Sequence, residues 1–188
     1  MAENKEGISE ELQKKVENLK QYIVGLGSLA IGFSGGVDSS LLVAVAHEVL
    51  GDRLIAVTGA DASVPERELN EAVAFCKERG IRHIVCNVDP LKEEGYRNNS
   101  PDRCYFCKHG IFTEVRKIAV ENGIEYMAEG SNVDDIGDYR PGLRAAAELS
   151  VKSPLREAVY DKFREIGFLF VTLDMKGYKS GSMNATLK

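Results

Sequence analysis

The sequence predicts an α/β protein in which a parallel five-stranded sheet is covered by helices on both faces. Two observations carry this prediction. Short apolar segments alternate with amphipathic segments of helical length along most of the 188 residues, as in parallel sheets connected by crossover helices. A glycine-rich turn lies between the first predicted strand and the next helix, at the sheet edge where such proteins bind ligands.

The individual elements follow from apolar periodicity and from the glycines that end them. Apolar residues at helical spacing predict a first helix over residues 8–23. The predicted strands are short apolar runs at residues 29–33, 54–58, 82–88, 125–128 and 168–173. The predicted helices between them cover residues 39–50, 65–79, 105–121 and 156–166. We therefore expect a main domain over residues 1–155 and a short C-terminal helix–strand appendage over residues 156–188.

The composition is that of a globular protein with no membrane segment. Hydrophobic residues make up 44% and charged residues 28% of the chain. The net charge of −5 argues against nucleic acid as a partner. No run of about 18 apolar residues exists, and the polar N-terminus lacks a signal-peptide pattern, so we expect a cytoplasmic location. Four cysteines in such a chain do not suggest a disulfide framework.

The segment SGGVDS at residues 34–39 has the features of a phosphate-binding turn. The start of the next helix supplies unpaired N–H groups and a partial positive charge. Gly35 and Gly36 let the backbone approach phosphate oxygens closely. Hydroxyl donors come from three serines, namely Ser34, Ser39 and Ser40.

Two further features of this turn bear on its chemistry. The carboxylate of Asp38 suits a Mg²⁺ bridge or an early-turn cap. No lysine follows the glycines, so the segment is neither a Walker loop nor the G-x-G-x-x-G dinucleotide pattern. A glycine-rich turn with a capped helix is the purely structural alternative.

A second motif, PDRCYFCK at residues 101–108, places Cys104 and Cys107 at the start of a predicted helix. The helix terminus, Arg103 and Lys108 are expected to favour the thiolate form. Such a pair can hold a metal or cluster, or serve in redox or sulfur-transfer chemistry. Packing roles are expected for the other two cysteines, Cys76 and Cys86.

A third motif, EGSNVDDIGDYRPG at residues 129–142, follows the fourth predicted strand. It gathers acidic residues and arginine in one short segment. A ligand site is one interpretation, and an ordinary capped turn before the next helix is the other.

Together these motifs resemble the LarE family, ATP-dependent sacrificial sulfur transferases among the N-type ATP pyrophosphatases of the PP-loop superfamily. The resemblance also rests on RAA, SPLREA and the C-terminal GYKSGSMN, and it covers residues 29–157 and 165–184. It implies a Rossmann-like fold of the adenine nucleotide alpha hydrolase-like type, with residues 1–155 as the ATP-binding domain. The chain is expected to be a short member that lacks an internal segment after residue 155.

The resemblance also implies site residues. The expected phosphate ligands are Ser34, Gly35, Gly36, Asp38 and Ser39, with Mg²⁺ bridged by Asp38. Gly59 and Ala60 are expected near the adenine edge. The residues expected near the nucleotide and the substrate are Gly130, Ser131 and Asp135.

The implied reaction adenylates a carboxylate of a pyridinium mononucleotide with release of pyrophosphate, and an enzyme thiol then delivers sulfur. The implied catalytic residues are Asp38, Cys104 and Cys107. Some family members hold an iron–sulfur cluster through the CxxC pair and a further cysteine, whereas no cysteine follows Cys107 here. The resemblance also implies a homo-oligomer.

Two alternatives remain open from the sequence. One is another adenylating enzyme of the same superfamily, an amidotransferase-like ligase or a tRNA thiolase. The other is a non-catalytic nucleotide-binding subunit that depends on a partner.

Overall fold

The computed structural model describes residues 10–61, 64–130 and 145, and it confirms the predicted α/β class. One parallel sheet has the strand order β3-β2-β1-β4. Its strands are β1 (Leu29–Gly32), β2 (Leu54–Ala60), β3 (His83–Asn87) and β4 (Met127–Glu129). The described sheet thus has four strands rather than five. The fifth predicted strand, at residues 168–173, lies outside the described residues, as does the whole predicted appendage.

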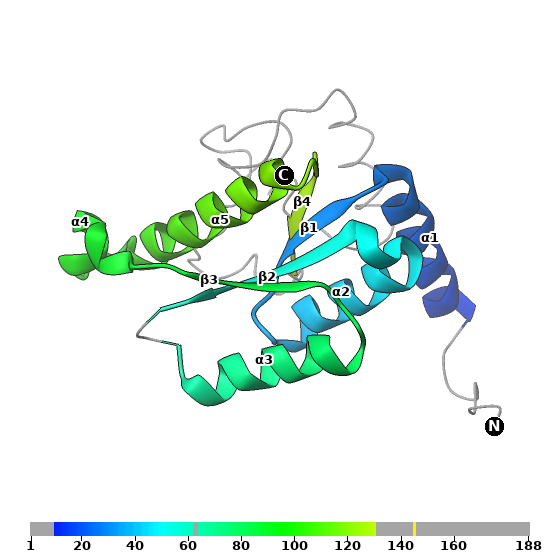
Figure 1. Cartoon of the computed structure of the whole chain (residues 1–188), viewed down its shortest axis with the longest axis horizontal. Helices are drawn as coiled ribbons and strands as arrows, with labels where there is room; N and C mark the ends of the chain where they lie inside the picture. The colour runs from blue at the N-terminus through cyan, green and yellow to red at the C-terminus, as the bar shows by residue number, and fades with distance from the viewer. Residues whose placement is uncertain (1–9, 62–63, 131–144, 146–188) are drawn as a thin grey trace, which may run out of the picture.

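Helices cover both faces of the sheet, as predicted (Figure 1). They are α1 (Glu10–Leu26), α2 (Val37–Leu50), α3 (Glu66–Glu78), α4 (Glu94–Arg97) and α5 (Arg103–Glu121). Two short 3₁₀ turns, η1 (Gly51–Arg53) and η2 (Pro90–Lys92), lie in the connections. Helices α1, α2 and α3 lie on one face and α5 on the other. Across the described ranges, no helix combines the length and the apolar character needed to cross a membrane.

Two hydrophobic cores lie on the two faces of the sheet because successive strand residues point in opposite directions. The strand residues that face α1, α2 and α3 are Leu29, Ile31, Leu54, Ala56 and Ala128. Those that face α5 are Ala30, Ile55, Val57 and Met127. Both central strands are therefore buried on both sides, which explains why they read as continuous apolar runs in the sequence.

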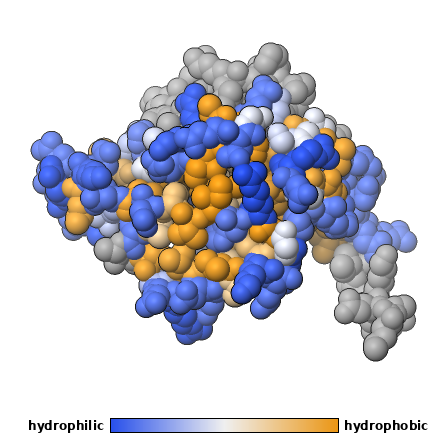
Figure 2. Space-filling view, in the orientation of Figure 1, coloured by the Kyte–Doolittle hydropathy of each residue, from blue (hydrophilic) through white to orange (hydrophobic). Residues whose placement is uncertain are grey.

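Strand β3 forms one edge of the described sheet. Figure 2 shows hydrophobic surface in the middle of the view, between the polar outer surfaces of the helices. Val85 of β3 contributes to the exposed apolar surface, with 42% of its area accessible. The sheet is therefore less completely covered at β3 than at its centre.

His83 at the start of β3 lies half-buried against the ring of Phe33, with ring centroids 5.8 Å apart in an edge-on arrangement. Burial lowers the pKa of His83 below its ordinary value of 6.5, because the apolar surroundings disfavour the charged imidazolium.

This shift predicts that His83 makes the protein less stable in mildly acidic solution. Because the folded state takes up a proton at His83 less readily than the unfolded state, the unfolded state binds more protons once the pH approaches and falls below about 6.5. We expect the free energy of unfolding of the wild type, measured in urea, to fall relative to His83→Gln between pH 7.5 and pH 5. If the difference in the free energy of unfolding between the wild type and His83→Gln stayed constant over this range, the lowered pKa of His83 would be contradicted.

Candidate active site

The first and third sequence motifs meet at the carboxyl edge of the sheet. Strand β1 pairs in parallel with both β2 and β4, so the segments after these strands lie on the same side. A Cβ atom on Gly130 would lie 2.5 Å from the backbone nitrogen of Ser39 and 2.7 Å from the carbonyl carbon of Asp38. The end of β4 thus rests directly on the first turn of α2. The predicted residues Ser131 and Asp135 lie outside the described residues.

The segment between β1 and α2 forms the expected tight turn, which we call the phosphate loop (residues 33–36). Gly35 has a φ of 79°, a left-handed conformation that favours glycine. Helix α2 begins at Val37, two residues earlier than predicted, with Gly36 as its N-cap and no side-chain cap. Because the N-cap glycine has no side chain, no side-chain cap occupies the N–H groups of the first turn. Asp38 is exposed in this turn.

The hydroxyls of Ser34 and Ser39 form a closed set of hydrogen bonds that joins the phosphate loop to the first turn of α2. The Ser39 hydroxyl donates to the Gly36 carbonyl oxygen at 3.0 Å, and the Ser34 and Ser39 hydroxyl oxygens are 3.1 Å apart. Since the Ser39 proton points to Gly36, Ser34 is the donor between the two serines. The Gly36 N–H in turn donates to the Ser34 hydroxyl oxygen at 3.3 Å. Ser39 is buried and braces the loop, whereas Ser34 is exposed.

These features fit an anionic ligand that carries a metal ion. The left-handed turn, the helix terminus and the exposed Ser34 hydroxyl suit phosphate oxygens. A carboxylate beside them, that of Asp38, would repel a bare anion and suits a phosphate whose charge is balanced by Mg²⁺. Ser40 lies at the rear of the turn, where its hydroxyl donates to the Gly35 carbonyl oxygen at 3.4 Å.

The two residues predicted at the adenine edge occupy different environments at the end of β2. A Cβ atom on Gly59 would lie 2.8 Å from the Ile111 side chain of α5, so this glycine permits close packing of strand and helix. Ala60 borders a pocket of about 510 Å³ at the ends of β2 and β3. The other lining residues are Asp61, Asn87, Val88, Asp89, Pro90, Leu91 and Tyr96.

Both thiols of the CxxC motif lie in the first two turns of α5, with Cys104 exposed and Cys107 half-buried. The pKa of the Cys107 thiol is raised, first by burial and then by the negative charge of Asp61 and the electrostatic effect of the neighbouring Cys104. Arg103 and Lys108 act in the opposite direction, but their effect is smaller. The expectation that the surroundings favour thiolate is therefore wrong for Cys107, because burial outweighs the nearby cations.

The described residues contain no group of three or more His, Cys, Asp and Glu side chains that could hold a metal ion. Cys104 and Cys107 thus give two of the four thiolates that an iron–sulfur cluster usually takes.

The short helix α4, for which the sequence analysis predicted no element, fixes the start of α5. The Phe106 ring packs against Gly95, where a Cβ atom would lie 2.0 Å from the ring. The Ser100 hydroxyl donates to the Gly95 carbonyl oxygen at 2.9 Å, and the Arg103 guanidinium lies over the Tyr96 ring. Phe106, which lies between the two cysteines, and Ser100 and Arg103, which precede them, therefore anchor the CxxC motif to a second element.

An ion pair that the sequence did not indicate joins the CxxC helix to the end of β4. Lys108 Nζ lies 3.2 Å from Glu129 Oε2, and 8% of the Glu129 side chain is exposed compared with 41% of Lys108. Glu129 directly precedes Gly130, the residue that touches α2. The ion pair thus places the thiols and the phosphate loop on neighbouring parts of one sheet edge.

The other two cysteines lie in packing positions. Cys76 in α3 is fully buried in the core on the α1–α3 face, and burial raises its pKa to about 11. The Cys86 thiol in β3 is half-buried and donates to the Thr58 carbonyl oxygen at 3.6 Å.

Comparison with known proteins agrees with this geometry. A protein-family model described as NAD synthase matches residues 10–117, which include the phosphate loop and the CxxC motif. The chain belongs to the NAD synthase family. Its PP-loop fold is also that of the NH₃-dependent NAD synthetase of Campylobacter jejuni, with a TM-score of 0.55 at 13% identity. That comparison covers 96% of this chain and 82% of the synthetase.

Two curated relatives of this NAD synthase family member match most of its length, and the first of them supports the resemblance to LarE proteins. The pyridinium-3,5-bisthiocarboxylic acid mononucleotide synthase of Lactiplantibacillus plantarum is 32% identical over 152 residues. An uncharacterized protein of Synechocystis is 38% identical over 151 residues. Each alignment covers 80% of this chain, but 55% and 56% of the respective relatives. The chain therefore spans about half the length of these relatives.

Gly130→Ala tests the contact between β4 and α2. The added methyl group would meet backbone atoms, so one of the two elements must move, at a cost of about 1–3 kcal/mol of stability. Chemical denaturation measures this cost. Gly123→Ala is the control, because a Cβ atom at Gly123 would meet no atom within 4 Å. The φ of 67° at Gly123 means that this control reports backbone strain alone. Equal stability of Gly130→Ala and the wild type would show that the contact is not tight.

Lys108→Met tests the ion pair with Glu129. Loss of the cation leaves the buried Glu129 charge less compensated, and we expect the free energy of unfolding to fall by about 1–3 kcal/mol. Adding Glu129→Gln to Lys108→Met removes that charge and should recover part of the loss. Strictly additive effects in this double-mutant cycle would mean that the two groups do not interact.

Proposed function

We propose that this protein uses ATP and Mg²⁺ to adenylate a carboxylate and releases pyrophosphate. The observation that carries the proposal is the phosphate loop, in which a left-handed turn at Gly35 precedes the uncapped start of α2 with Ser34 and Asp38 exposed beside it. The absence of a lysine after the glycines favours release of pyrophosphate over the phosphate transfer typical of Walker loops. Membership of the NAD synthase family supports the same chemistry.

In the proposed first step, a carboxylate oxygen of the substrate attacks the α-phosphorus of ATP. The bond from that phosphorus to the oxygen shared with the β-phosphate breaks, and pyrophosphate leaves with the electron pair. The N–H groups at the start of α2 and the Ser34 hydroxyl would stabilise the charge on the departing pyrophosphate. Asp38 would hold Mg²⁺, which neutralises phosphate charge when bound.

We further propose that a thiol of the CxxC motif attacks the activated carbonyl carbon. A C–S bond forms, the bond from carbon to the AMP oxygen breaks, and AMP leaves, so that the acceptor is bound to the enzyme as a thioester. Loss of the cysteine Cα proton and cleavage of its Cβ–Sγ bond would then release the acceptor as a thiocarboxylate and leave dehydroalanine in the chain. Cys104 is the better placed thiol because it is exposed, whereas Cys107 is half-buried with a raised pKa. The pocket at the ends of β2 and β3 borders Asp61, whose charge acts on Cys107, and offers space for the acceptor. The name of the Lactiplantibacillus relative supports a pyridinium mononucleotide acceptor.

The thiols also bear on assembly. If Cys104 and Cys107 hold an iron–sulfur cluster, the remaining ligands must come from other residues, and a symmetric copy of the chain is one source. We therefore propose a homo-oligomer with active sites near the subunit boundary, located in the cytoplasm, with a small-molecule nucleotide as substrate.

A second candidate function shares the adenylation step but ends with an amine instead of sulfur. The match to the NAD synthase family favours it, because such an amide-forming ligase needs the same phosphate loop. The CxxC motif has no role in that reaction, so Cys104→Ala would leave an ammonia-dependent ligase active.

Product analysis tests the adenylation proposal. With ATP, Mg²⁺ and pyridinium-3,5-biscarboxylic acid mononucleotide as acceptor, we expect AMP and pyrophosphate to form, as measured by ³¹P NMR. ADP and free phosphate as the products would refute the proposal. Sulfur transfer predicts mass gain on the acceptor only when Cys104 is present.

Asp38→Ala tests the role proposed for Asp38. We expect turnover to fall about 100-fold, because the Mg²⁺ ion that balances the charge of the departing pyrophosphate loses its protein ligand. The thermal midpoint should change little, since Asp38 is exposed. Asp52→Ala, an exposed acid beyond the other end of α2, is the matched control and should retain activity. Full activity of Asp38→Ala would remove this residue from the mechanism.

A further inference from the structure

A buried polar side chain lies beneath the phosphate loop among apolar neighbours. Thr58 of β2 is 5% exposed, and its side chain lies on the same face of the strand as Ala56, toward α1, α2 and α3. Phe33, which is 2% exposed, belongs to the same core. A hydroxyl in such surroundings is costly unless it is hydrogen-bonded. Thr58 therefore needs partners, and their identity indicates what it does.

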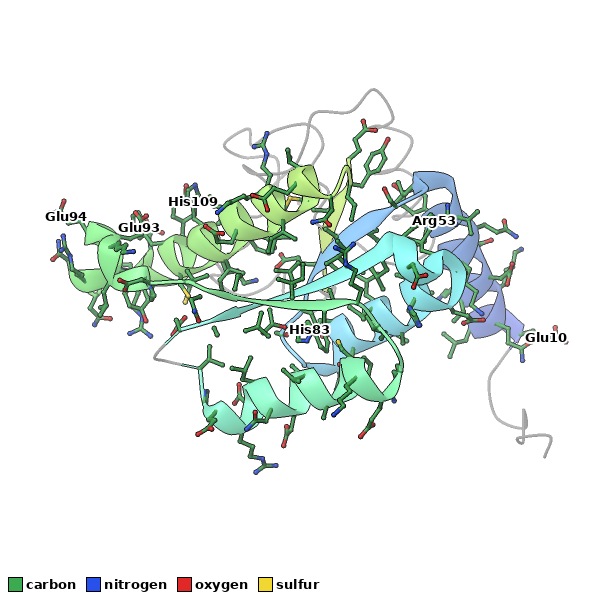
Figure 3. All side chains as sticks on the ribbon, viewed as in Figure 1. Glu10, Arg53, His83, Glu93, Glu94 and His109 are labelled. Carbon is green, nitrogen blue, oxygen red and sulfur yellow. The ribbon has the colours of Figure 1, made fainter. Side chains whose placement is uncertain are left out.

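Two short hydrogen bonds satisfy the Thr58 hydroxyl. It donates to the carbonyl oxygen of Phe33 at 2.7 Å, and its oxygen lies 2.7 Å from Nε2 of His83. A threonine hydroxyl has one proton, which here points to Phe33, so His83 must be the donor in the second bond. Figure 3 shows His83 between the sheet and helix α3. The result is a chain of two hydrogen bonds, in which His83 donates to Thr58 and Thr58 donates to Phe33.

The end of this chain lies at the point where the polypeptide leaves the sheet. Phe33 directly precedes Ser34, and its N–H donates to the Val57 carbonyl oxygen at 2.8 Å. Both backbone polar groups of Phe33 are thus tied to β2, one through the main chain and one through the Thr58 side chain. Together these bonds fix the peptide plane between Phe33 and Ser34, and with it the direction in which the phosphate loop begins.

We infer that Thr58 and His83 are positioning residues for the phosphate loop, which hold the Phe33–Ser34 peptide in the orientation that receives the phosphates of ATP. This inference rests on the proposed function, because it concerns the site that would bind ATP. His83 fixes the direction of the Thr58 hydroxyl, and that hydroxyl fixes Phe33. Neither side chain is required to touch the nucleotide.

The test compares the binding of ATP–Mg²⁺ and of adenosine to the full chain by isothermal titration calorimetry. Thr58→Val keeps the side-chain shape but removes the hydroxyl, and His83→Leu removes the donor. We expect both to weaken ATP binding about threefold to tenfold, as for the loss of one hydrogen bond. Adenosine has no phosphates, so its affinity should not change. Thr58→Ser restores the hydroxyl and should bind ATP nearly as the wild type does.

Cys86→Ala is the matched control, because the Cys86 thiol also contacts Thr58, at its carbonyl oxygen, but not Phe33. It should leave ATP affinity unchanged. Circular dichroism checks that each variant is folded. If Thr58→Val does not fold, His83→Leu is compared with His83→Gln, which keeps an N–H donor and should retain ATP affinity.

Three results would overturn the inference. The first is an unchanged ATP affinity in folded Thr58→Val and His83→Leu. The second is an equal loss of ATP affinity and adenosine affinity in these variants. The third is an equal loss of ATP affinity in His83→Gln and His83→Leu. A wild-type protein that does not bind ATP would overturn the proposed function as well. A wild type that does not bind ATP thus counts against the proposed function, whereas a wild type that binds ATP with the same affinity as the variants counts against this inference alone.

Discussion

The contact between the end of β4 and the start of α2 is the constraint on which the site depends. Gly130 lies so close to Ser39 and Asp38 that a side chain at this position would collide with the backbone of α2. Because β1 lies between β2 and β4, this contact closes one side of the phosphate loop while β2 supports the other. The loop is thus held between two parallel strands and the helix that it begins.

Polar side chains within the sheet reinforce this arrangement. Each makes a bond that main-chain pairing does not provide: Thr58 to the carbonyl oxygen of Phe33, and Glu129 to Lys108 of α5. Both lie near the carboxyl ends of their strands, where the chain turns away from the sheet. Buried polar groups of this kind fix one geometry, because any rearrangement would leave a donor or acceptor without its partner.

The sequence predicted the features that depend on local patterns. Alternation of apolar strands and amphipathic helices gave the fold class, and the order of strand, glycines and helix located the phosphate loop. Helix α4 was missed because it is four residues long and polar, and its position depends on the packing of Gly95 against Phe106. The raised pKa of Cys107 could not be predicted either, because burial and Asp61 act on it through the fold. Likewise, no sequence pattern connects Thr58 with His83, 25 positions apart.

The first turns of helix α5 and the rest of the helix have different roles. Its first turns carry the thiols and contact α4, whereas its buried core residues are Phe112, Val115, Ile118 and Ala119, all farther along the helix. Natural selection can therefore alter the thiol end without unpacking the core on that face of the sheet. The thiols could thus be replaced by other side chains while α5 keeps its packing against the sheet.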